Sequence, residues 1–168
     1  MSFRDLIKED IDIVNIAGES WIKIKEENNY ICYLLAGLME NSIFGENNNY
    51  LESNIYTYLK KCDLAKELKK IYKDKIVPVS LDLISLDGLK DYGKTKGEIL
   101  SIMNLDMYRE CRSNITNTDN SYWLATPQST PGGFSSDGLC YVRTNGCVDY
   151  AFRKSYIGIR PFFIIKKN

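Results

Sequence analysis

The chain has 168 residues, of which 44% are hydrophobic and 26% charged, a balance that fits one globular domain and excludes a disordered chain. Its 22 basic and 22 acidic residues cancel, so no positive field favours nonspecific binding to nucleic acid. Histidine is absent, which removes the commonest general base and the commonest zinc ligand.

The cysteines and the first residues indicate where the protein is made. Five cysteines occur without a Cys-x-x-Cys pair, so a zinc ribbon or a thioredoxin motif is excluded, and we interpret them as reduced and mostly buried. They are Cys32, Cys62, Cys111, Cys140 and Cys147. The start of the chain is charged and lacks the apolar region of a signal peptide, and no apolar run is long enough to cross a membrane. We therefore expect synthesis in the cytoplasm, no signal peptide and no membrane partner.

The sequence predicts a single domain over residues 11–168, preceded by a short segment. In residues 1–10, Phe3, Leu6 and Ile7 have helical spacing, which predicts a short helix or a terminal arm.

The first half of the chain predicts a hairpin followed by two helices. The alternating run 21–25 and the apolar run 30–35 are separated by turn residues, which is typical of paired strands. Ser53 is a favourable N-cap for a helix that reaches Cys62. We expect Asp63 to cap a second helix.

The middle of the chain is predicted to contain a short strand over residues 83–86 and a helix over residues 98–112. The polar loop 113–121 is rich in side-chain oxygen atoms. Calcium loops supply several carboxylates, whereas this loop has only Asp119, so we expect no metal there.

In the last third, residues 121–126 predict a strand, and residues 128–138 predict an exposed loop that carries Phe134. Two alternating runs then flank Asn145–Gly146, which predicts a type I′ hairpin. In that register Cys140 faces Ala151.

The final strand is predicted over residues 159–165 and is apolar throughout, which indicates a central position in a sheet. Arg160 lies within this apolar context. Because a buried guanidinium needs partners, we expect Arg160 to clamp loops to the strand through hydrogen bonds rather than to bind a ligand.

Several short motifs resemble a family of unknown function found in bacteria and their prophages. The motifs are Ile16–Trp21, Ser53–Leu59, Val79–Leu86, Trp123–Pro127, the hairpin around Asn145–Gly146, and Tyr156–Pro161. The resemblance implies an α+β fold of the C-type-lectin-like kind, shared with sulfatase-modifying enzymes and phage receptor-binding proteins, with a small twisted antiparallel sheet and flanking helices. We assign structural roles to Trp123, Asn145, Gly146 and Arg160.

The chain also departs from those relatives. Ala125 stands where the family usually has arginine, and the spacing of Cys140 and Cys147 does not resemble the redox pair of the formylglycine-generating enzymes. The calcium motifs of carbohydrate-binding C-type lectins, Glu-Pro-Asn and Trp-Asn-Asp, are absent. The resemblance therefore implies a fold and no particular activity.

We consider three functions. The first is a non-enzymatic component of a phage or phage-tail-like particle, on its tail, baseplate or capsid surface, with other particle proteins or copies of itself as partners. The second is a module that binds cell-surface glycan or protein through the loops 113–121 and 128–138. Its candidate contact residues are Tyr122, Phe134, Tyr141 and Tyr150.

The third function is an enzyme that uses Asp137, Asp149 and Cys140, which we disfavour because no histidine is present to activate the thiol. We expect no catalytic site, no cofactor and no metal.

Overall fold

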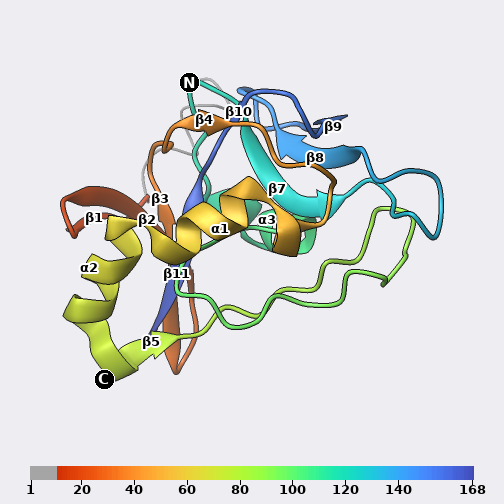
Figure 1. The fold of residues 1–168 in the computed structure, drawn as a ribbon. Coiled ribbons are helices and arrows are strands. Elements are labelled where there is room, and N and C mark those ends of the chain that lie inside the picture. Colours follow the sequence, from red (N-terminus) through yellow and green to blue (C-terminus); the bar gives the residue numbers. More distant parts are fainter. Residues whose placement is uncertain (1–10) are drawn as a thin grey trace.

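The computed structural model describes residues 11–168, so the arm or helix predicted for residues 1–10 lies outside the described residues. The described part is a mixed α+β structure with two mainly antiparallel sheets and few helices, which confirms the predicted class (Figure 1). No helix within residues 11–168 has the length and apolar character needed to cross a bilayer.

The first sheet is built around the end of the chain, with the strand order β1-β2-β3-β11-β5 and with β6 also paired to β11. Its strands are β1 (Ile13–Ile16), β2 (Glu19–Glu26), β3 (Tyr30–Leu35), β5 (Ile76–Val77), β6 (Ser101–Ile102) and β11 (Pro161–Lys166). The predicted hairpin is confirmed as β2 and β3, whose register shifts between Lys23 and Lys25. The central position of the last strand is also confirmed, because β11 has β3 on one side and β5 and β6 on the other.

The second sheet has the strand order β4-β10-β7-β8-β9. Its strands are β4 (Asn41–Ser42), β7 (Tyr122–Pro127), β8 (Gly138–Val142), β9 (Val148–Phe152) and β10 (Ile157–Gly158). Strand β7 is buried along its whole length, whereas β9 has only β8 beside it and forms an edge of the sheet (Figure 1).

The helices are α1 (Asn54–Lys61), α2 (Asp63–Tyr72) and α3 (Leu105–Cys111), with short 3-10 helices η1 (Tyr50–Glu52), η2 (Lys73–Lys75) and η3 (Arg112–Asn114). The predicted cap of α1 is confirmed, because Ser53 Oγ accepts a hydrogen bond from Tyr56 N at 3.0 Å. The cap position of α2 is Cys62, so the prediction for Asp63 is wrong by one residue.

Two predictions for the middle of the chain are wrong. Residues 98–104 are not helical, because Ser101 and Ile102 pair with β11 and the helix begins only at Leu105, after the Asn104 cap. Residues 83–86 form no strand; the neighbouring residues make isolated bridges instead. In the first case Leu100, Ile102 and Met103 are buried without the helix that their spacing predicts. In the second case Leu83 is buried without a strand, whereas Leu86 is exposed.

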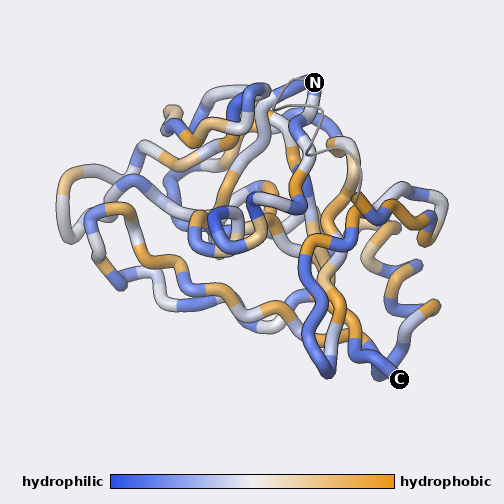
Figure 2. The backbone as a smooth tube through the Cα atoms, turned by 180° about the vertical axis from the view of Figure 1, so that it is seen from behind, coloured by the Kyte–Doolittle hydropathy of each residue, from blue (hydrophilic) through white to orange (hydrophobic). Residues whose placement is uncertain are grey.

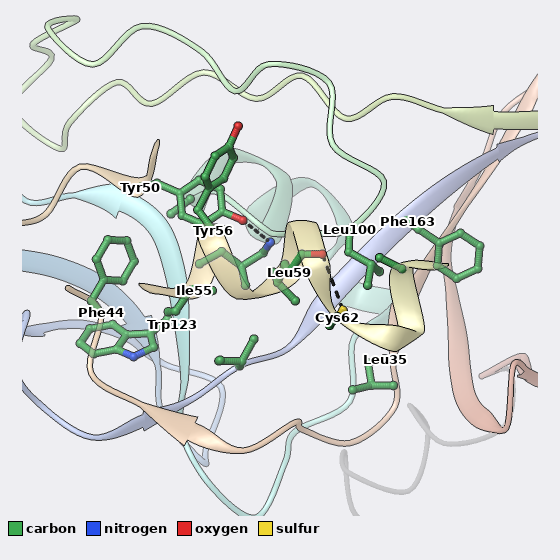
Figure 3. Close-up of a cluster of buried hydrophobic side chains, with 14 of the residues drawn as sticks. Leu35, Phe44, Tyr50, Ile55, Tyr56, Leu59, Cys62, Leu100, Trp123 and Phe163 are labelled. Carbon is green, nitrogen blue, oxygen red and sulfur yellow. Dashed lines mark hydrogen bonds between the residues drawn. The ribbon is translucent and has the colours of Figure 1, made fainter. Parts of the chain in front are cut away.

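The core consists of two apolar clusters. Figure 2 shows hydrophobic and hydrophilic residues alternating along the helical segments, as expected for amphipathic helices. In the first cluster α1 packs its buried face near Phe44, Trp123 and Phe163 (Figure 3). The Trp21 and Phe163 rings lie edge to face, with centroids 4.7 Å apart. The second cluster joins Phe162 of the first sheet to the buried face of β7 and β8. Each cluster therefore contains residues of both sheets.

Candidate binding surface

Arg160 is a buried clamp between the two sheets. Its side chain is fully buried, and its guanidinium donates to Leu35 O at 2.8 Å, Ala36 O at 3.0 Å, Thr116 O at 2.8 Å and Thr116 Oγ1 at 3.2 Å. Burial lowers the pKa of this guanidinium. These contacts match the hydrogen-bond network expected from the sequence, and they fasten the loop 113–121 to the core.

Tyr122 is part of this clamp and is not available to a ligand. It is 1% exposed, and the Arg160 guanidinium lies 5.0 Å from the centre of its ring. Burial raises the pKa of Tyr122. Trp123 is likewise fully buried, and its Nε1 donates to Ser42 O at 2.9 Å. The proposed contact role of Tyr122 is therefore wrong.

The Asn145–Gly146 turn is not the type I′ turn predicted. Within the turn only Gly146 has a positive φ, of 84°. Gly146 N donates to Arg143 O at 2.8 Å, and Asn145 Oδ1 accepts from Cys147 N at 3.0 Å. This pattern is typical of a three-residue loop that ends in a left-handed glycine. The Tyr108 hydroxyl of α3 donates to Gly146 O at 2.6 Å, so a contact with a neighbouring helix helps to select this turn.

The different turn changes the register of the hairpin by one residue. Cys140 pairs with Tyr150, not with Ala151, and Val142 pairs with Val148. Because successive side chains point to opposite faces, a one-residue shift moves every side chain of β9 to the other face.

Tyr141 lies on the opposite face from Tyr150. It pairs with Trp123 of β7 and with Asp149 of β9, is half-buried, and packs against the first core cluster. Of the four predicted contact residues, the structure therefore leaves only Phe134 and Tyr150 well exposed and on the same surface.

Five exposed apolar side chains gather around the edge strand, and we call them the β9 surface. They are Leu86 (46% exposed), Phe134 (82%), Val148 (39%), Tyr150 (56%) and Phe152 (50%). Three come from alternate positions of β9, one from the loop 128–138 and one from the loop after residue 83. A set of large apolar side chains exposed together on a soluble domain is a mark of an interaction site.

A shallow hollow of about 320 Å³ lies within this surface, lined by Leu86, Asp87, Gln128, Ser129, Phe134 and Tyr150. Ser129 Oγ donates to Asp87 Oδ2 at 2.6 Å and accepts from Phe134 N at 2.8 Å. Ser129 and Ser85 both donate to the Asp87 carboxylate and lower its pKa. The hollow therefore combines two aromatic rings with an ionised carboxylate and an amide side chain.

The enzyme arrangement considered from the sequence is not formed. Cys140 is fully buried, and burial raises the pKa of its thiol to about 12. Asp149 pairs with Tyr141 and so lies on the opposite face from Cys140, while Asp137 accepts from Arg153 Nε at 2.9 Å. All five cysteines are free, and Cys147 is the exposed one. Residues 11–168 bring together no cluster of three acidic or cysteine side chains that could hold a metal ion.

The fold and the surface together define the class of the protein, an α+β domain with an exposed apolar edge strand. Comparison with protein-family models, with curated proteins and with solved structures found no match to this chain. The resemblance of its short motifs to a prophage-associated family is therefore a hypothesis about fold and origin.

Sequence reasoning missed Leu86, Val148 and Phe152, and also the polar lining of the hollow. The alternation of β9 was visible in the sequence, but an alternating apolar face usually packs on a core. Nothing local indicated that β9 is an edge strand. Asp87 and Ser129 meet across 42 positions of sequence, which only the tertiary structure determines.

Proposed function

We propose that this protein is a non-enzymatic interaction module of a phage or phage-tail-like particle, and that it works through protein–protein contact at the β9 surface. The observation that carries the proposal is the group of exposed apolar side chains on and beside an edge strand. Aromatic side chains are enriched in protein interfaces, and Phe134, Tyr150 and Phe152 supply three of them.

The assignment to a particle rests on the resemblance to prophage-associated proteins. We propose the C-type-lectin-like fold on the same basis. Support comes from a first sheet with the last strand at its centre, flanked by helices, and from a loop-rich second half. An experimental structure with a different strand order would contradict the fold proposal.

Co-sedimentation with purified particles tests the functional proposal. We expect wild-type protein to occur in particles of its own host in many copies, as measured by mass spectrometry. A triple variant, Phe134→Ala, Tyr150→Ala and Phe152→Ala, should fold but lose its place in the particles. The matched control is Ile71→Ala, which removes an exposed apolar side chain from α2, far from β9 (Figure 1). Absence of the wild-type protein from particles would refute the assignment to a particle.

The hollow supports a second candidate, the binding of a cell-surface glycan. Aromatic rings can stack on the apolar face of a sugar, while Asp87 and Gln128 offer hydrogen-bond partners for its hydroxyl groups. Binding to isolated cell walls should then fall on Gln128→Ala as well as on Phe134→Ala. A protein–protein contact made by β9 alone should tolerate Gln128→Ala, so this variant separates the two candidates.

A further inference from the structure

We propose that the partner of β9 is the β9 strand of a second copy of this chain, paired antiparallel about a two-fold axis at Tyr150. Such pairing would join two five-stranded sheets into one continuous sheet. The inference rests on the proposed function of the β9 surface as a protein–protein contact and names its partner.

The hydrogen bonds at both ends of the hairpin show which residues of β9 direct their backbone groups to β8. Arg143 N donates to Cys147 O, and Arg153 N donates to Asp137 O, both at 2.8 Å. In an antiparallel pair, residues that exchange hydrogen bonds alternate with residues that do not. In this register Asp149 and the alternate residue Ala151 direct their backbone groups to β8.

The backbone groups of Val148, Tyr150 and Phe152 therefore point away from β8. Among residues 11–168, no other strand pairs with that side of β9. Pairing about Tyr150 places Tyr150 opposite its own copy and Val148 opposite Phe152 of the second copy. Each of these pairs matches an outward N–H with an outward carbonyl, so the edge is complementary to itself. The Phe152 carbonyl also accepts from Ser155 N at 2.8 Å, so it would receive the second copy through its other lone pair.

The side chains agree with the same register. Val148, Tyr150 and Phe152 lie on one face, so the pairing stacks aromatic and β-branched side chains against each other across the axis. On the other face Asp149 lies opposite Ala151 of the second copy, so no like charges meet. A two-fold axis at Asp149 would instead oppose two carboxylates and would use backbone groups already bonded to β8.

Strand β9 also lacks the usual protection of an edge. Natural edge strands are often blocked by lysine, proline or an inward-pointing charge. Residues 148–152 contain neither lysine nor proline, and their one charged residue, Asp149, lies on the face away from the exposed aromatic rings.

Asp149 nevertheless competes with a second strand for one amide. Its Oδ1 accepts from Tyr150 N at 2.8 Å, and this N–H must turn to the Tyr150 carbonyl of the second copy when the strands pair. We expect Asp149→Ala to strengthen dimerisation roughly tenfold, because it removes the competing acceptor. An unchanged dissociation constant would contradict this step.

A charge exchange at Tyr150 tests the two-fold axis. Sedimentation velocity of the full chain from micromolar to millimolar concentration should show a dimer for wild type. Tyr150→Lys and Tyr150→Glu should each raise the dissociation constant of the dimer by more than roughly tenfold, because like charges then lie directly opposite each other. An equimolar mixture of the two variants should restore the dimer, because the charges across the axis are then opposite.

Controls separate this proposal from the wider function. Ile71→Lys and Ile71→Glu, on the exposed face of α2, should leave dimerisation unchanged, and near-ultraviolet circular dichroism should show that all variants are folded. Wild-type protein that stays monomeric, or a mixture that does not recover, overturns self-pairing. If the monomer still enters particles and Tyr150→Lys prevents it, β9 binds a different protein, and the proposed function stands without the dimer.

Discussion

Strands β11 and β9 each contain two aromatic residues but differ in the exposure of those side chains. In β11, Phe162 and Phe163 are fully buried, whereas in β9 Tyr150 and Phe152 are at least half exposed. The difference lies in the neighbours: β11 has strands on both sides, and β9 has only one. The same residue types therefore stabilise the fold at one position and form a candidate contact surface at the other.

The buried Arg160 should show the largest effect on stability. Arg160→Ala leaves the buried carbonyl of Leu35 and the partly buried carbonyls of Ala36 and Thr116 without their donor. Unsatisfied buried acceptors cost about 1–3 kcal/mol each, so we expect a loss of roughly 5 kcal/mol, enough to unfold a marginal domain. Urea denaturation measures the free energy of unfolding. A variant that unfolds at the wild-type midpoint would show that the clamp is dispensable.

A pair of phenylalanine substitutions tests the comparison of the two strands directly. Phe163→Ala should cost roughly 3–5 kcal/mol, because it opens a cavity beside Trp21. Phe152→Ala at the edge should change the free energy of unfolding by no more than about 0.5 kcal/mol. The same denaturation experiment gives both values at a concentration that favours the monomer. Equal losses for the two variants would mean that β9 is packed as tightly as β11.

Tyr56 extends the comparison to a buried polar contact. Its hydroxyl donates to Glu98 Oε1, which also accepts from Lys96 N at 2.9 Å, while Glu98 Oε2 has no partner among the described residues. Tyr56→Phe removes one of the two donors and should cost about 1–3 kcal/mol. Tyr58→Phe, on the same helix but partly exposed, is the control and should have little effect.

The buried tyrosines should also set an alkaline limit. Burial, together with the hydrogen bond to Glu98, raises the pKa of Tyr56 from 10.0 to about 12, and burial raises that of Tyr108 from 10.0 to about 12. A pKa that is higher in the folded state means stability that is complete below pH 10 and is lost as the pH rises through about 12. Tyrosinate absorbance and circular dichroism should therefore change together in this window. Complete ionisation of the tyrosines near pH 10 without loss of structure would contradict the prediction.

The sequence by itself determined the features that depend on local physics. The hairpin of β2 and β3 follows from alternating apolar residues on either side of turn residues, and Ser53 begins α1 because its hydroxyl accepts a free backbone amide. The apolar run that ends the chain indicated a central strand, and Arg160 within it indicated a buried hydrogen-bond network.

Only the tertiary structure decided which aromatic residues are exposed and which segments meet. Ser101 and Ile102 are not helical because pairing with β11 buries them. Tyr108 of α3 binds Gly146 in the turn, and the register that follows from this turn places Tyr150 on the exposed face of β9. The sequence selected Tyr122, Phe134, Tyr141 and Tyr150 by residue type alone. Exposure depends on the neighbours of a strand, and those neighbours come from distant parts of the chain. The local pattern therefore could not separate Tyr122 and Tyr141, which are buried or half-buried, from Phe134 and Tyr150, which are exposed.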